Sequence, residues 1–304
     1  AAAVAIAFAV AGWITYSAAQ RELIAEVDGY LSRTEELERQ MRLQTNDPVS
    51  IERFAQAMQA SVKGWTDDEI ETVSDIIGEL ETDLAAYELP LPERIHLIRI
   101  GSFAGANNLP HCRKASIVLP DGFFNGRMPQ KRVLAHELFH VLSSHNPQLR
   151  DQLYAIIGFK RCNEIELPDS LAAKRLTNPD APTNQHRIEL RNEDGDSFSA
   201  VPIITLDVDR YTGGVFMQHM KLSLMVLEKN SQGSWVAKLD SGQPELLDPK
   251  QVPDFMKQIG RNTRYIIHPE ETLADNFSML VLGRKDAPDP WVMEKMREVL
   301  VAKD

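Results

Sequence analysis

The chain has 304 residues, of which 43% are hydrophobic and 25% charged, a composition typical of a globular protein with one large domain or two small ones. Its formal net charge of -11 argues against a general nucleic-acid-binding protein, because such a protein needs a basic face to neutralise phosphates. No basic run in the sequence departs from this balance. Length and composition thus exclude nucleic acid as the partner and leave the motifs to indicate the function.

The first nineteen residues differ in composition from the rest of the chain. Residues 1–13 carry no polar side chain, and Ser17-Ala18-Ala19 is an acceptable small-residue cleavage site. The run approaches the ~20 residues that span a bilayer, although its many alanines make it weakly apolar. We expect residues 1–19 to be a signal-like or membrane-anchor segment, and the protein to be exported (periplasmic or extracellular) or membrane-anchored. A buried helix is the alternative.

Residues 20–88 show the apolar periodicity of packed helices. A long helix over 20–47 carries a heptad-like seam, and a second helix covers about 49–62. Thr66 and Glu69 form a capping box that begins a third helix. We expect an all-helical module that acts as a scaffold or dimerisation element.

The pattern changes after the proline-marked joint "ELPLPERIHL", where we place a domain boundary at residue 89. We predict strands at 94–100 and 115–119, helices at about 132–146 and 148–158, and an irregular stretch over 163–200. Three further strands lie in "VPIITLDVD", "KLSLMVLEKN" and "SWVAKLD", and the chain ends in helices. The expected fold class is α+β, in which residues 89–304 form one domain with a β-rich insertion at about 186–240.

The stretch "RVLAHELFHVLSSHN" carries the clearest chemical signal. His136 and His140 are four residues apart, so a helix places both imidazoles on one face, within reach of one metal ion. Glu137 stands at the position of the general base in the H-E-x-x-H pattern of zinc metallopeptidases. Apolar neighbours would fix this helix in a core. We interpret the stretch as a zinc-binding helix, the alternative being a core helix with satisfied histidines.

A catalytic zinc needs a third protein ligand and an open position for water. A histidine six residues after His140, with a glycine between them, would supply it in one class, but Asn146 and Ser143 stand there, and His145 is out of register. A glutamate on a later helix is the other option. In "HPEETLADNF", Glu271 and Asp275 are four residues apart and share a helix face, so one could ligate and the other orient a ligating histidine.

"HELFH" followed by "EETLAD" resembles the gluzincin class of zinc metallopeptidases. The resemblance implies zinc ligands His136, His140 and Glu271, with Glu137 catalytic and Asp275 supporting. Glu270 is the runner-up ligand, but residue 274 is alanine, so it lacks an acidic residue four positions on. The resemblance also implies a zincin-like metallopeptidase domain, in which "KASIVLP" is the strand beside the cleft and binds an extended peptide by β-augmentation.

The expected reaction is peptide-bond hydrolysis, with water activated by Zn²⁺ and Glu137. Tyr265 and His268 lie next to the predicted ligand helix and are candidate oxyanion donors, although core packing of Tyr265 and helix capping by His268 explain them equally well. Tyr211 and His219 are candidates by residue type alone. His96 is predicted to be structural. The pair His111-Cys112 lacks the companions that a second metal site needs.

Three functional hypotheses remain open from the sequence. The first is a zinc endopeptidase that acts on a peptide or protein. The second is a non-catalytic zincin-fold protein that binds a partner, and the third is a zinc amidase or aminopeptidase. Retention of Glu137 favours catalysis, because a purely structural site needs no general base. The sequence leaves open the oligomeric state and whether Cys112 and Cys162 pair.

Overall fold

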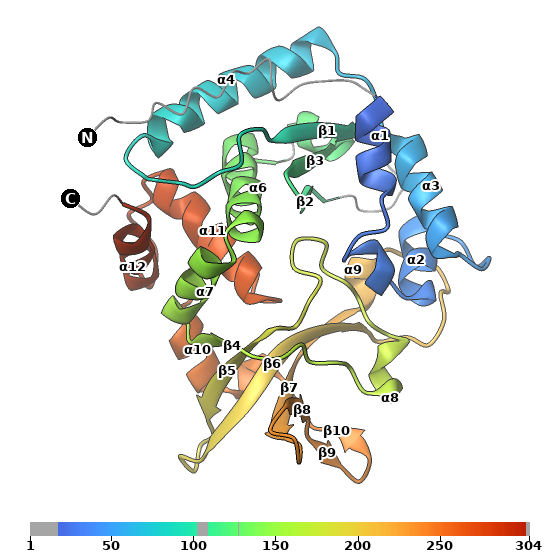
Figure 1. Ribbon diagram of the computed structural model, residues 1–304, viewed down its shortest axis with the longest axis vertical. Helices are drawn as coiled ribbons and strands as arrows, with labels where there is room; N and C mark the ends of the chain where they lie inside the picture. Colours follow the sequence, from blue (N-terminus) through green and yellow to red (C-terminus); the bar gives the residue numbers. More distant parts are fainter. Residues whose placement is uncertain (1–17, 102–108, 127, 302–304) are drawn as a thin grey trace.

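The computed structural model describes residues 18–101, 109–126 and 128–301. They form an α+β fold with a three-stranded sheet and a larger six-stranded sheet. Helices α6 (Gln130–His145) and α11 (Pro269–Val281) lie side by side between the two sheets (Figure 1). In the described part of the chain, no helix is long and apolar enough to cross a membrane. The predicted signal or anchor segment falls almost wholly on residues 1–17, outside the described residues, and stays a prediction.

The first three helices are shorter than the sequence pattern suggested. The predicted helix over 20–47 is in fact two helices, because the Asp28 carboxylate accepts the N–H groups of Tyr30 and Leu31 at 2.9 and 3.0 Å and closes a turn. Thr34 follows with an extended backbone and ends a short 3-10 turn. The helices of this part are α1 (Ala18–Ala25), η2 (Leu31–Arg33), α2 (Glu36–Leu43), α3 (Ile51–Ser61) and α4 (Asp67–Leu84).

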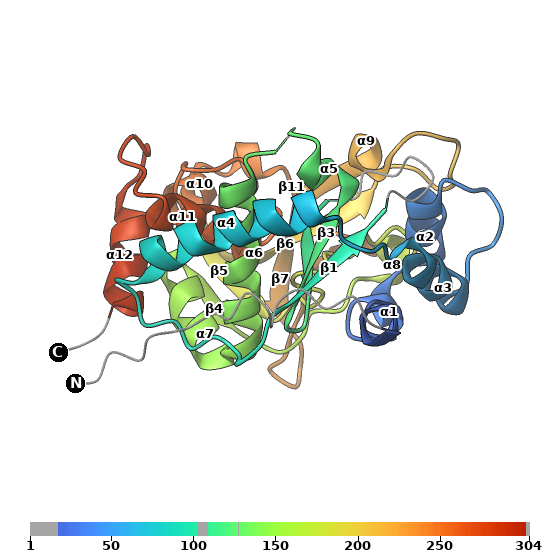
Figure 2. The same ribbon diagram turned by 90° about the horizontal axis from the view of Figure 1, so that it is seen from above.

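Helix α4 begins at the predicted capping box, in which the side chains of Thr66 and Glu69 bond each other's backbone N–H. Its apolar face, including Val73 and Ile77, packs in the largest core together with α6 and α11. Figure 2 shows α4 lying across α6, with α1, α2 and α3 at the far end of the molecule from α12 (Trp291–Leu300). The predicted boundary at residue 89 therefore does not divide the hydrophobic cores.

The three-stranded sheet consists of β1 (His96–Ile100), β2 (His111–Arg113) and β3 (Ser116–Pro120), in the order β1-β3-β2. Strand β3 is the central strand: it runs parallel to β1 and antiparallel to β2, and all its residues are buried. The "KASIVLP" strand contacts α6, but the expectation that it is an exposed edge able to pair with a peptide is wrong. That edge is β2, which contacts α6 and has one side free of strand pairing among the described residues.

The larger sheet is antiparallel and lies between α6 and α11 in the sequence. The three strands predicted after residue 200 are present, but the stretch expected to be irregular contains three elements that were missed. They are the short helix α8 (Asp169–Ala172), a six-residue strand and the start of its partner strand. The strands are β4 (Phe159–Arg161), β5 (His186–Arg191), β6 (Ser197–Leu206), β7 (Met220–Lys229), β8 (Trp235–Ala237) and β11 (Leu246–Leu247), with β9 (Leu239–Asp240) paired to β10 (Gln243–Pro244).

Helix α11 is enclosed by other helices. Each of the thirteen residues of α11 is buried, since α6, α7, α12 and α4 all contact it. A helix enclosed in this way holds its side chains in fixed positions, which suits a metal-binding element. The remaining helices are α5 (Asp121–Phe124), α7 (Pro147–Ile156), α8 (Asp169–Ala172), α9 (Phe216–His219), η3 (Pro249–Gln251) and α10 (Pro253–Ile259).

Candidate metal centre

Helix α6 carries the two histidines on its buried side. The helix begins after Pro129, and its apolar residues, such as Leu138 and Phe139, are buried in the main core. His140 is 1% exposed and Glu137 4% exposed, so both polar side chains lie inside the protein. Burial of such groups is costly unless they are paired. The partner of His140 comes from the facing helix α11, and that of Glu137 from strand β2.

Glu271 joins the two imidazoles. Its Oε2 lies 3.2 Å from Nε2 of His136 and 3.6 Å from Nε2 of His140. The three side chains predicted from the sequence as ligands are thus together, although 135 residues separate His136 from Glu271. The position of Glu271 in the first turn of α11 follows from the start of that helix. Nδ1 of His268 accepts the N–H of Glu270 at 3.1 Å and caps the helix, and Pro269 comes next.

A carboxylate lies within hydrogen-bonding distance of Nδ1 of each imidazole. Asp275, one turn after Glu271, places Oδ1 3.1 Å from Nδ1 of His136, as the sequence predicted. Glu270 places Oε1 2.9 Å from Nδ1 of His140. A hydrogen bond at Nδ1 fixes the tautomer that presents Nε2 to a metal. Both histidines are therefore oriented with Nε2 toward Glu271.

Glu270 has a different place from the one that the sequence suggested. It is not an alternative to Glu271 in the space between the imidazoles, since its carboxylate lies on the outer side of His140. Its second oxygen accepts hydrogen bonds from Ser143, at 2.7 Å, and from the Tyr154 hydroxyl. Ser143, which argued against a third histidine ligand, thus helps to hold a buried carboxylate. The sequence gives no signal for this role, because it depends on α7 packing against both helices.

Glu137 points toward strand β2. The Cys112 thiol donates to the backbone carbonyl of Glu137 at 3.0 Å and lies 3.6 Å from its Oε2. Cys112 and Cys162 are both free thiols, so the two cysteines do not pair. Burial raises the pKa of Glu137 despite the two nearby imidazoles. A carboxylate with a raised pKa is a stronger base, which suits a group that accepts and then returns a proton.

Interactions among the side chains of the centre shift the pKa values of His136 and Glu271 in the direction opposite to burial. Burial lowers the pKa of His136, but hydrogen bonds to Asp275 and Glu271 outweigh it and raise the pKa to about 9. Burial raises the pKa of Glu271, but the imidazoles of His140 and His136 outweigh it and hold that pKa well below its usual range. The carboxylates of the centre thus stabilise positive charge on the imidazoles, and the same negative field attracts a cation.

One buried nitrogen without a hydrogen-bond partner indicates that a metal fits the centre. Among the described residues, Nε2 of His140 has no hydrogen-bond partner, although the side chain is enclosed. Buried polar atoms without partners are uncommon in native proteins, and an absent ion is one explanation. Oε2 of Glu271 lies 3.6 Å from this nitrogen and 3.2 Å from Nε2 of His136, so two imidazoles and one carboxylate surround the same point. Two imidazoles and a carboxylate are the donor set of a zinc site with an open position.

Comparisons with family models, curated proteins and solved structures found no match for this chain. The interpretation of the centre therefore rests on its own geometry.

Two residues of the loop between α8 and β5 also reach the centre, and the sequence did not predict them. Nδ2 of Asn178 donates to Oε1 of Glu271 at 2.7 Å. Asp180 offers an oxygen that lies within 4.8 Å of donor atoms of His140 and Glu271. Burial raises the pKa of Asp180 well above its usual value. Both residues lie in the proline-, asparagine- and aspartate-rich stretch that was predicted to be irregular, where no periodicity indicates which side chains point inward.

Of the candidate oxyanion donors, Tyr265 is beside the centre. Its ring stacks on His136 with centroids 6.1 Å apart, and burial keeps the pKa of its hydroxyl well above 10. His268 is the helix cap described above, and burial lowers its pKa to about 4. The capping alternative therefore accounts for His268. Tyr211 donates to the carbonyl of Gly214, and His219 lies 3.2 Å from Asp207, in the region around α9.

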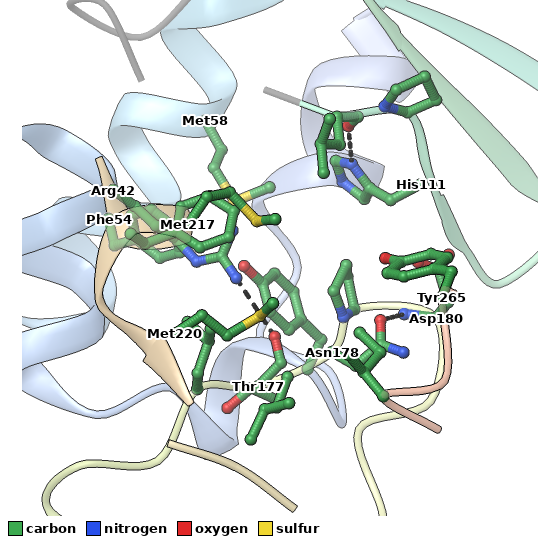
Figure 3. Close-up of a pocket in the computed structure, with 18 residues that line it drawn as sticks. Arg42, Phe54, Met58, His111, Thr177, Asn178, Asp180, Met217, Met220 and Tyr265 are labelled. Atoms are coloured by element: carbon green, nitrogen blue, oxygen red, sulfur yellow. Dashed lines mark hydrogen bonds between the residues drawn. The ribbon is translucent and has the colours of Figure 1, made fainter. Parts of the chain in front are cut away.

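An apolar cavity of about 80 Å³ adjoins the centre. Figure 3 shows Asp180 and Tyr265 on one side of it, and Phe54, Met58 and Met217 on the other. Its walls come from α2, α3, α9 and the loop before β5, which are far apart in the sequence. The cavity gives the centre a place for an apolar group.

Proposed function

We propose that the chain is a zinc-dependent peptidase with a gluzincin-like centre in a zincin-like domain. His136, His140 and Glu271 would hold the zinc, and Glu137 would be the general base. The observation that carries this proposal is the convergence of both Nε2 atoms on one oxygen of Glu271, at 3.2 and 3.6 Å. The carboxylates behind both Nδ1 atoms support it, because they orient the imidazoles toward that point.

When bound, zinc supplies a water of lowered pKa and polarises the carbonyl under attack. The residues of this chain do the rest. Glu137 takes the proton of the attacking water and gives it to the leaving amine, for which its raised pKa suits it. The Tyr265 hydroxyl, kept protonated by burial, donates a hydrogen bond to the oxyanion.

An extended peptide has a binding edge beside this centre. Among the described residues, strand β2 pairs with β3 on one side only, and the N–H of Cys112 points to its other side. A peptide that adds a strand to this edge would lay its backbone next to Glu137, because Cys112 contacts that residue. Backbone pairing tolerates many side chains, so we infer a peptide or protein substrate.

The test is zinc content together with cleavage of a peptide library, comparing the wild type with Glu137→Gln. We expect near-stoichiometric zinc in both proteins, and cleavage by the wild type alone. Zinc binding without cleavage by the wild type would favour the non-catalytic, partner-binding alternative. Absence of zinc from the wild type would contradict the proposal at its first step. Cleavage restricted to substrates with a free N-terminus would favour an aminopeptidase.

A further inference from the structure

The segment 178–183, called the strap from here on, crosses the centre between two anchored ends. On one side, the N–H of Leu176 donates to the carbonyl of Ile204 at 3.1 Å. On the other, the carbonyl of Asn184 accepts the N–H of Ile165 at 2.9 Å. Figure 1 shows this part of the chain, between α8 and β5, rising from the larger sheet into the middle of the molecule.

The strap occupies the free edge of β2 and also contacts the proposed metal ligand Glu271, and a bound peptide needs both places. Oδ1 of Asp180 accepts the N–H of Cys112 at 2.5 Å, which takes up the outward-facing amide of the edge strand β2. Nδ2 of Asn178 donates to Glu271 at 2.7 Å. The backbone N–H of Asp180 bonds Oδ1 of Asn178, so the two side chains are held as a unit.

Cavities lie on both sides of the strap and follow β2 in order. Residues 109–111 line the apolar cavity of about 80 Å³, and residues 112–114 line a second cavity of about 400 Å³. Pro179 and Asp180 line both. The strap therefore divides a cleft that would otherwise run along the edge strand. Figure 3 shows Asp180 at the border of the first cavity.

The carboxylate of Asp180 also completes a donor set. His140, Asp180 and Glu271 can each bring one donor atom within 4.8 Å of the others, and so can Cys112, Glu137 and Asp180. Three carboxyl groups that gather around a buried imidazole repel one another when they are ionised, and a cation between them removes that repulsion. Nε2 of His140 is buried and has no hydrogen-bond partner among the described residues. This nitrogen is therefore available to bind a metal ion in the same cluster.

We propose that Asp180 is a displaceable fourth ligand of the metal and that the strap is an internal plug, which must leave β2 before a peptide can bind. The inference rests on the proposed function, because it assumes the metal held by His136, His140 and Glu271. A zinc with four protein ligands is closed, whereas a catalytic zinc keeps one position for water. The strap thus holds the centre in a closed, protected form.

The variant Asp180→Asn tests the inference, because the amide oxygen can still accept the Cys112 N–H while the anionic ligand is gone. We expect a zinc affinity at least about tenfold lower, as loss of a supporting group alone costs that much. We also expect a several-fold higher kcat/KM on the peptides that the wild type cleaves. Asp169→Asn is the matched control, because Asp169 is exposed at the start of α8. It should change neither quantity.

Hydrogen exchange of the wild type gives a second readout that needs no variant and no activity. Addition of zinc alone to the metal-free protein should slow amide exchange in the strap and at Cys112. Unchanged exchange, or wild-type zinc affinity in Asp180→Asn, would overturn the inference. Lower activity of Asp180→Asn with zinc retained would instead make Asp180 part of the catalytic machinery, which also overturns it. If no protein cleaves peptide, the proposed function fails, while affinity and exchange still decide the role of Asp180.

Discussion

Glu270 and His140 form a buried hydrogen-bonded pair, 2.9 Å from Oε1 to Nδ1, with both side chains at most 2% exposed. The adjacent Glu271 faces the opposite nitrogen of the same ring. Neighbouring glutamates on one helix turn thus act on the two edges of one imidazole. This difference in position predicts a difference in effect on metal binding.

Glu271→Ala is expected to abolish stoichiometric zinc binding, because it removes a direct ligand. Glu270→Gln should keep zinc but weaken its affinity about 10- to 100-fold, because the imidazole loses its anionic partner. Metal analysis after dialysis against graded chelator separates the two outcomes.

Glu245→Gln is a suitable control, since Glu245 lies between β10 and β11 and pairs with Lys238. Equal zinc loss in Glu270→Gln and Glu271→Ala would argue against the ligand assignment.

Tyr154→Phe should destabilise the protein. The Tyr154 hydroxyl donates to Glu270 inside the core, and its removal leaves a buried carboxylate oxygen with one donor fewer. We expect a loss of about 1–3 kcal/mol in the free energy of unfolding, measured by urea denaturation of the metal-free protein. Tyr211→Phe, which removes an exposed hydroxyl bonded to Gly214, should change it little. A similar loss in both variants would contradict the explanation.

Arg113 on β2 pairs with Asp28 at 2.7 Å, and its side chain is 3% exposed. It also donates to the carbonyls of Ile24 and Glu26, which ties the end of α1 to the edge strand. Arg113→Ala should cost about 3–5 kcal/mol of stability, because it leaves a partly buried carboxylate and two carbonyls without their donor.

The neighbouring residue provides the control for this ion pair. Lys114 bonds Glu26 at 2.6 Å, but both side chains are about half exposed. Lys114→Ala should therefore cost no more than about 1 kcal/mol. Thermal unfolding of both variants in one buffer checks the contrast, and equal shifts in Tm would count against it.

His111 should make stability depend on pH below neutrality. Burial lowers its pKa from 6.5 to about 4, so the folded protein resists a proton that the unfolded chain accepts. The stability that this neutral imidazole provides is complete above pH 6.5 and is lost as the pH falls toward 4. In His111→Phe, the free energy of unfolding should fall less steeply between pH 6.5 and 4. If the free energy of unfolding of variant and wild type changed with pH in the same way, His111 would not be the cause of the pH dependence.

The sequence was informative where regular helices carry polar residues at fixed spacing. Spacing of four placed His136 with His140 and Glu271 with Asp275, and the structure brings these side chains to one point. Helix geometry makes such contacts predictable, because residues four apart share a face. The two helices also had clear starts, at Pro129 and at His268-Pro269.

What the sequence did not reveal depends on tertiary packing. The outer position of Glu270 follows from α7, which brings Tyr154 to its second oxygen. The approach of Asp180 follows from a loop without periodicity, so no spacing rule could find it. The break in the predicted helix over 20–47 depends on one local competitor, the Asp28 carboxylate, which bonds two backbone N–H groups in a turn.

The larger sheet lies in the stretch of chain between the two helices of the centre, and 135 residues separate His136 from Glu271. A metal bound by both would act as a cross-link that closes this stretch into a loop. The entropy of loop closure rises only with the logarithm of length, about 0.6 kcal/mol for each doubling. Residues added at the solvent-exposed turns of this sheet should therefore change the cross-link little, which makes those turns suitable positions for grafted loops.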